Sequence, residues 1–143
     1  MTACLFCGIA SREVEAVVVL DESDVVAFLD HRPLFLGHCL LIPKKHVPAL
    51  SDLPAKLVEP FFGAAQRLAG AMEVALQAEG AFIAINNKVS QSVPHLHVHV
   101  VPRRKKDGLR GFFWPRQKYP SEQVRDEVAG RIREALSDSR SGA

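Results

Sequence analysis

The stretch His95-Leu96-His97-Val98-His99-Val100-Val101, which lies between two prolines, decides the fold. Successive side chains of an extended strand point to opposite faces, so the three histidines share one face and the aliphatic residues share the other. The strand rise puts neighbouring imidazoles about 6–7 Å apart and the outer two about 13 Å apart. One small anionic group, or one metal ion, therefore meets two of these histidines more easily than all three. A lone histidine is often just a satisfied polar side chain, but three in strict alternation predict a functional site on this strand.

Four other β-rich runs come before this strand. The first two are separated by Asp21-Glu22-Ser23-Asp24, a polar sequence typical of a hairpin turn. The third run ends at Pro43, where a strand can end without the loss of a ladder hydrogen bond. The four runs are residues 14–20, 25–29, 38–43 and 82–86. Since strands and helices do not alternate regularly, this order predicts an α+β fold with a five-stranded antiparallel sheet.

Two helical patterns complete the expected fold. Apolar residues recur every three or four positions from Leu57 to Leu76, which predicts a long central helix. Pro60 is expected to kink or restart this helix, and Gly80 is expected to stop it. A C-terminal helix is predicted to begin after Ser121. The apolar positions that this second helix is expected to bury are Val124, Val128, Ile132 and Leu136.

Length and composition favour one soluble domain. The 143 residues suit a single domain over residues 1–136, and the small polar residues 137–143 predict a disordered tail. The whole sequence has 18 Lys and Arg and 16 Asp and Glu, so its net charge does not indicate nucleic-acid binding. The apolar runs are too short to span a membrane, and residues 1–10 lack the features of a signal peptide. Three cysteines are too few for a disulfide framework, so we expect a cytoplasmic protein with reduced thiols.

The alternating histidines are accompanied by further motifs in a specific order. These motifs are Val26–Asp30, Gly37–His46, Asn86–Asn87, Gln91–Val93 and the histidine strand followed by Pro102–Arg103. With them the sequence resembles the histidine-triad (HIT) family of nucleotide hydrolases and transferases over most of its length. The resemblance implies a HIT-like fold that forms a homodimer. It also implies that His97, the middle histidine, is the nucleophile, and that His38 supports it from a neighbouring strand. His99 lies one pleat further and is placed to donate a hydrogen bond to the phosphate or the leaving oxygen.

The resemblance also implies which residues bind the nucleotide. Asp30 corresponds to the position that contacts the ribose hydroxyls, and Phe28, on the same face, could wall the base. On position alone, Asp30 is equally an ordinary turn residue and Phe28 an ordinary core aromatic. The phosphates are assigned to Asn86, Gln91 and Ser92. The sequence departs from the family pattern before Gln91, where the loop is short and Ser90 replaces a glycine.

Cys4-x-x-Cys7 provides half of a tetrahedral metal site, because zinc favours cysteine and histidine ligands. On their own, the two thiols could equally be a redox pair or simple reduced thiols. The resemblance implies that His46 and His95 complete the site, so one structural zinc per chain is expected. His97 and His99 are then left for the substrate. Cys39 lies in an apolar strand and is expected to be an inert core thiol.

The segment 103–118, which follows the histidine strand, contains seven basic residues and one acid, Asp107. We expect Arg103, Arg104, Lys105 and Lys106 to assist polyphosphate binding by electrostatics. Phe112, Phe113 and Trp114 are expected to cover the core or a dimer partner rather than to form a nucleic-acid surface.

Together these features predict a hydrolase that binds an adenine nucleotide and cleaves nucleoside polyphosphates or phosphoramidates at the α-phosphate. The expected intermediate is a covalent nucleotidyl-histidine on His97. Two alternatives stay open. The protein could be a phosphorylase or nucleotidyltransferase that uses another acceptor, or a nucleotide-binding regulator with vestigial activity.

Overall fold

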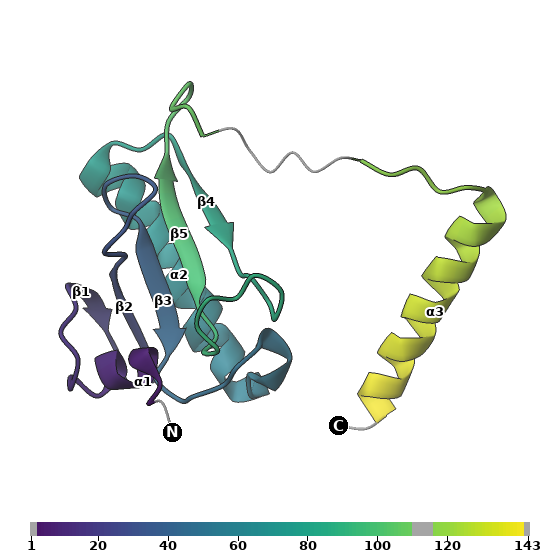
Figure 1. The fold of residues 1–143 in the computed structure, drawn as a ribbon, viewed down its shortest axis with the longest axis horizontal. Helices are drawn as coiled ribbons and strands as arrows, with labels where there is room; N and C mark the ends of the chain where they lie inside the picture. Colours follow the sequence, from purple (N-terminus) through teal and green to yellow (C-terminus); the bar gives the residue numbers. More distant parts are fainter. Residues whose placement is uncertain (1–2, 110–115, 142–143) are drawn as a thin grey trace. The chain divides into compact units, whose positions relative to one another are not determined.

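An antiparallel sheet with strand order β1-β2-β3-β5-β4 carries the site (Figure 1). The computed structural model describes residues 3–109 and 116–141. The strands in these ranges are β1 (Val18–Asp21), β2 (Val25–Leu29), β3 (Cys39–Pro43), β4 (Gly80–Ala84) and β5 (Val98–Arg103). The helices are α1 (Leu5–Ala10), α2 (Ala55–Leu76) and α3 (Glu122–Ser141), with a 3-10 turn at Leu50–Asp52. The predicted α+β class and five-stranded antiparallel sheet are therefore confirmed.

Alternation along the strands gives the sheet two packed faces. On β2, Val25 and Ala27 join the core under α2, whereas Val26 and Phe28 join a second cluster with Phe6 of α1. On β5, Val98 and Val100 face α2. Residues between them on β5 point to the α1 side, as the period of two requires. The α1 side of the sheet is therefore where the histidines are presented.

Strand pairing brings distant residues to the same place on the sheet. In the β3–β5 ladder, Leu40 pairs with His99 and Leu41 with Val98. The start of β3 therefore lies beside the start of β5, and His38 lies next to the histidine strand. On the other side of β5, Ala84 pairs with His99 and Gly80 with Arg103.

The histidine strand is shorter at its start than the sequence predicts. β5 begins at Val98, so His95 and His97 precede it. The amide of Leu96 donates to the carbonyl of Val47, 2.8 Å away, rather than to a neighbouring strand. The alternation nevertheless persists, because Leu96 is fully buried in the α2 core with Val98. β1 and β4 are also displaced from their predicted ranges.

The central helix differs from the prediction at Pro60 and at its end. α2 is continuous from Ala55 to Leu76, so Pro60 does not divide it. Pro60 lacks only the N–H that would reach the carbonyl of Lys56, and Phe61 beside it is fully buried. The helix ends at Gln77, which adopts the left-handed φ of 55°, and Gly80 begins β4 instead.

The chain divides into two compact units, residues 1–107 around the sheet and residues 108–143. The single domain predicted over residues 1–136 stays a prediction. In the second unit, α3 continues to Ser141, so residues 137–141 of the predicted disordered tail are helical. Ile132 and Leu136 are 56% and 59% exposed, against the expected burial. No helix in the described part of the chain is long and apolar enough to cross a membrane.

Candidate active site and metal centre

The three alternating histidines divide between two neighbouring sites. His95 is fully buried and faces Cys4, Cys7 and His46, whereas His99 faces His38. His97 lies between them, 3% exposed, with its ring centroid 5.1 Å from that of His99. His95 thus lies apart from the pair formed by His97 and His99, and the roles expected of the three histidines stay predictions.

The hydrogen bonding of His97 fixes which ring nitrogen is nucleophilic. Its Nδ1 lies 2.8 Å from the backbone carbonyl of His95. A carbonyl oxygen only accepts, so Nδ1 must carry the proton and donate it. In the neutral imidazole, Nε2 then holds the free lone pair. His97 therefore presents a nucleophilic nitrogen on the edge opposite to the main chain.

A chain of hydrogen bonds fixes His38 and His99 in the same way. The amide of Leu34 donates to His38 Nδ1 over 3.1 Å, so the proton of neutral His38 is on Nε2. That nitrogen lies 3.0 Å from His99 Nδ1 and donates to it. The remaining proton of neutral His99 is consequently on its Nε2. His97 and His99 thus offer one lone pair and one N–H donor side by side.

Both supporting histidines are held in the neutral form. Burial, with smaller contributions from His97 and His38, lowers the pKa of His99 to about 4, although Asp30 opposes the shift. Burial also lowers the pKa of His38, again against Asp30. At neutral pH the proton positions described for His38 and His99 therefore apply.

The low pKa of His99 predicts a dependence of stability on pH. In the unfolded chain His99 titrates near 6.5, so between pH 6.5 and 4 the unfolded state binds more protons than the folded state. The contribution of His99 to the free energy of unfolding is thus fully present above about pH 6.5, and it decreases as the pH falls towards 4. Thermal unfolding measured across this range should show a smaller decrease for His99→Asn than for the parent protein. Equal slopes for the two proteins would contradict the assignment.

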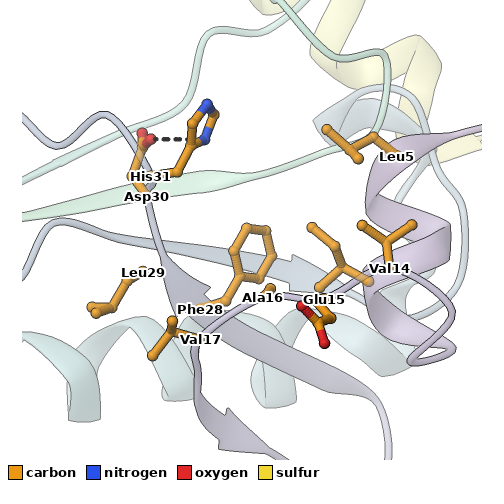
Figure 2. A pocket seen from close by; sticks show the side chains of 10 residues that line it. Leu5, Val14, Glu15, Ala16, Val17, Phe28, Leu29, Asp30 and His31 are labelled. Atoms are coloured by element: carbon orange, nitrogen blue, oxygen red, sulfur yellow. Dashed lines mark ion pairs between the residues drawn. The ribbon is translucent and has the colours of Figure 1, made fainter.

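An open pocket of about 840 Å³ lies beside the end of β2 (Figure 2). Its walls are mostly apolar, and they include Leu5 and Ile9 of α1 and Phe28 of β2. Asp30 lies at its edge, where Oδ1 is 3.9 Å from Nδ1 of His31 and Oδ2 is 3.7 Å from Nε2 of His38. Asp30 therefore lines the pocket and also lies beside His38. Phe28 belongs both to the core and to the pocket wall, so both of its predicted roles fit the structure.

The three residues assigned to phosphate binding lie in different environments. The side chain of Gln91 accepts from the amide of Lys88 at 3.1 Å and donates to the carbonyl of Pro48 at 2.6 Å. Its amide is therefore engaged with the backbone instead of facing a ligand. Asn86 is exposed, and Ser92 lines a second pocket of about 400 Å³ together with Cys4 and His46.

Ser90 keeps the backbone shape that a glycine would provide. Its φ is 60°, within the left-handed region that glycine adopts most readily. Lys88 has a φ of 71° in the same short loop. Left-handed conformations of other residues cost free energy and cluster at functional sites. Ser90 therefore adopts a backbone conformation that a glycine at this position would also allow.

Four ligand atoms meet at the start of α1. The Nδ1 of His95 lies 3.4 Å from Cys4 Sγ, 3.5 Å from Cys7 Sγ and 3.2 Å from His46 Nδ1. Cys7 Sγ lies 3.3 Å from His46 Nδ1. A tetrahedral zinc ion, with bonds of about 2.3 Å to sulfur and about 2.0–2.1 Å to nitrogen, needs ligand atoms about 3.3–3.6 Å apart. The donor set and its spacing therefore fit a zinc ion.

The proton on His95 points away from this cluster. Its Nε2 lies 2.8 Å from the carbonyl of Pro43 and must donate to it, so the lone pair on Nδ1 faces the cysteines. Two histidines converging on the cysteine pair favour a metal site over a redox pair. A second group, formed by Asp30, His38 and His99, is less suited to a metal because His38 Nε2 carries its proton.

The basic residues Arg103, Arg104, Lys105 and Lys106 lie at the end of β5 away from His97. About 20 Å of extended chain separates His97 from Arg103. Arg103 forms two hydrogen bonds with Asp107, at 2.6 and 3.0 Å, and the guanidinium of Arg104 donates to the carbonyl of Leu76, so these two residues hold the turn against the end of α2. The electrostatic role expected of the four residues stays a prediction. The predicted aromatic cover at Phe112, Phe113 and Trp114 lies outside the described residues.

Sequence reasoning missed Phe6. This residue lies between the two cysteines, is 4% exposed, and contacts the rings of His97, His95 and Phe28. Helix α1 is too short to show a periodic apolar pattern in the sequence. The one available signal for the role of Phe6 is that an aromatic residue lies inside the Cys-x-x-Cys motif.

Comparisons with known proteins agree with this geometry. The family model described as the HIT domain matches residues 11–106. An uncharacterized HIT-like protein of Mycobacterium tuberculosis is 35% identical, over 98% of this chain and 97% of the relative. An adenosine 5′-monophosphoramidase of Saccharomyces cerevisiae is 36% identical, over 81% of this chain and 72% of the relative. A zinc-bound histidine triad family protein of Mycobacterium smegmatis is 35% identical with a TM-score of 0.72, covering 99% of this chain and 98% of that structure.

Proposed function

Because the chain belongs to the HIT domain family, we propose that it hydrolyses nucleoside 5′-phosphate derivatives at the α-phosphorus. The observation that carries this proposal is the pair formed by His97 and His99. One offers a lone pair on Nε2 and the other an N–H on Nε2, and both proton positions follow from backbone hydrogen bonds.

The proposed reaction has two displacement steps. In the first, Nε2 of His97 attacks the α-phosphorus, a P–N bond forms, and the bond to the leaving group breaks; the Nε2–H of neutral His99 donates a hydrogen bond to the phosphate or the leaving oxygen, and the leaving group takes its proton from solvent. In the second, water attacks the phosphorus, the P–N bond breaks with its electron pair returning to Nε2 of His97, and the proton of the water passes to solvent. The products are the leaving group and a nucleoside monophosphate, and both histidines return to their starting forms.

The bond from His97 Nδ1 to the His95 carbonyl supports the first step. When Nε2 bonds to phosphorus, the imidazole ring becomes positively charged and its Nδ1–H becomes a stronger donor. Hydrogen bonds with a charged partner are shorter and stronger than neutral ones. The carbonyl of His95 therefore stabilises the intermediate more than the resting enzyme, which is the condition for accelerating the reaction.

The pocket beside β2 is the proposed nucleoside site. Its apolar walls suit a base, and the Asp30 carboxylate at its edge can accept hydrogen bonds from ribose hydroxyls. Adenosine is the proposed nucleoside, because a relative is an adenosine 5′-monophosphoramidase. The edge strand β4 is the proposed contact for the homodimer that the family resemblance implies.

We propose that Cys4, Cys7, His46 and His95 hold one zinc ion. Four protein ligands fill a tetrahedral site, so the ion would supply a structural cross-link and leave no position for water. The cross-link would join α1, the segment after β3 and the residue two positions before the nucleophile. A zinc-bound relative of 35% identity supports this choice of metal.

A substrate panel with and without inorganic phosphate tests the proposed reaction. Adenosine 5′-phosphoramidate and diadenosine polyphosphates should both yield AMP, and 10 mM phosphate should not divert the product to ADP. Enzyme quenched with an alkaline denaturant should carry the nucleotidyl group in an acid-labile, base-stable linkage typical of a P–N bond. Formation of ADP would establish the phosphorylase alternative. Tight binding of AMP without turnover of any substrate would instead establish the regulatory alternative.

A further inference from the structure

One phenylalanine ring connects the metal cluster with the nucleophile. Phe6 lies in α1 between Cys4 and Cys7, and its ring centroid is 5.1 Å from that of His97, at an interplanar angle of 84°. The same ring lies 6.0 Å from His95 at 73° and 5.5 Å from Phe28 at 66°. Phe6 thus contacts a proposed metal ligand, the nucleophile and the pocket wall at once.

The imidazole of His97 needs this second restraint. Its hydrogen bond to the His95 carbonyl holds Nδ1 in place, but one bond leaves the ring able to tilt about that contact. The nearly perpendicular ring of Phe6 occupies the space into which His97 would tilt, and both side chains are buried. The direction of the Nε2 lone pair therefore depends on where Phe6 lies.

The position of Phe6 depends in turn on α1. This helix has only six residues, far fewer than the dozen or more that an isolated helix needs. It is fixed by the burial of Phe6 and Ile9 and by the convergence of its two cysteines on His46 and His95. Release of the cysteines would therefore free α1 and, with it, the ring that restrains His97.

We propose that Phe6 is a positioning residue that aligns the nucleophile and transmits the state of the metal site to it. This proposal rests on the proposed function, because it assumes that His97 is the nucleophile. It goes beyond that function by giving the metal site an effect on the chemical step as well as on folding.

A cycle of variants tests this coupling. Phe6→Leu is compared with Phe61→Leu, a matched substitution of a buried phenylalanine in α2 outside the site. Each is combined with His46→Ala, which removes the exposed ligand of the cluster. We expect Phe6→Leu to lower kcat by about 10²-fold with little change in KM, as a misplaced reacting group does. Phe61→Leu should lower the Tm and leave kcat unchanged.

The double variants carry the decisive comparison. His46→Ala should lower kcat in the parent and in Phe61→Leu, but it should have little further effect in Phe6→Leu, because effects through one contact are not additive. All rates are measured where circular dichroism shows the proteins to be folded. If Phe6→Leu does not fold, Phe6→Met replaces it with the same expected result.

A spectroscopic measurement provides a readout other than activity. In protein labelled with ¹⁵N-histidine and held at pH 8, the ring nitrogens of His97 should show one tautomer, with the proton on Nδ1. Phe6→Leu and metal-free parent protein should both show an averaged pair of signals, whereas Phe61→Leu should resemble the parent.

Three outcomes would overturn the proposal. A rise in KM with unchanged kcat in Phe6→Leu would make Phe6 only a support of the pocket through Phe28. Additive effects of Phe6→Leu and His46→Ala would separate the metal site from the nucleophile. An unchanged His97 spectrum would show that its ring needs no second restraint. In each of these cases removal of the His97 imidazole would still abolish turnover, whereas failure of the proposed function would leave that variant active.

Discussion

Replacement of His97 by asparagine is expected to reduce turnover by at least about 10³-fold and to leave the fold intact. The asparagine amide can still donate to the His95 carbonyl, as Nδ1 does over 2.8 Å in the present structure. It has no nitrogen lone pair in the position of Nε2, so the P–N bond cannot form. The measurement is the single-turnover rate with adenosine 5′-phosphoramidate, together with detection of the nucleotidyl enzyme after an alkaline quench.

His97→Ala is the matched comparison for this variant. Alanine also removes the nucleophile, but it leaves the buried His95 carbonyl without its donor, so it should lower the Tm more than asparagine does. Both variants should bind AMP with nearly the parent affinity in a calorimetric titration, because the pocket proposed for the nucleoside is lined by residues of β2 and α1. Turnover within tenfold of the parent in either variant would exclude His97 as the nucleophile.

Removal of the metal is expected to cause the largest loss of stability. Purified protein should contain about one zinc per chain by elemental analysis. Metal binding to a preformed site contributes to the free energy of folding, so chelation or Cys7→Ser should lower the Tm by about 10 °C or more. The reason is local: without the ion, two cysteines and two histidines with ligand atoms 3.2–3.5 Å apart have no common partner.

Cys39→Ala is the control for the metal prediction. Cys39 is buried in β3, outside the cluster, and its Sγ lies 3.3 Å from the carbonyl of Gly37. This variant should lose some stability through its small cavity but keep one zinc per chain. Parent protein that contains no metal and has the same Tm with and without chelator would show that Cys4 and Cys7 are simple reduced thiols.

Periodicity along the sequence was sufficient to predict the sheet and the face that carries the histidines. The alternation of Leu96, Val98 and Val100 with the histidines is a local property, and it holds although regular pairing begins only at Val98. The central helix was predicted for the same reason. The end of this helix was not predicted, because Gln77 adopts a left-handed conformation that a glutamine does not indicate in the sequence.

Proton positions could not be predicted from the sequence. They depend on hydrogen bonds with backbone groups in three separate parts of the chain: the amide of Leu34, the carbonyl of Pro43 at the end of β3 and the carbonyl of His95. The engagement of Gln91 by Lys88 and Pro48 is equally invisible in the sequence, since the family resemblance suggested only its place in the chain. Residue types indicated which groups take part, whereas tertiary contacts decide what each group can donate or accept.

The cluster of Cys4, Cys7, His46 and His95 also has a consequence for the order of folding. Its first and last members, Cys4 and His95, are 91 residues apart, so the complete cluster forms only after the strands between them have assembled. During synthesis, the first two ligands emerge long before the last. Interactions made late in folding slow unfolding more than they speed folding. The ion would therefore slow unfolding and prolong the lifetime of the folded protein. It would leave the rate of folding almost unchanged.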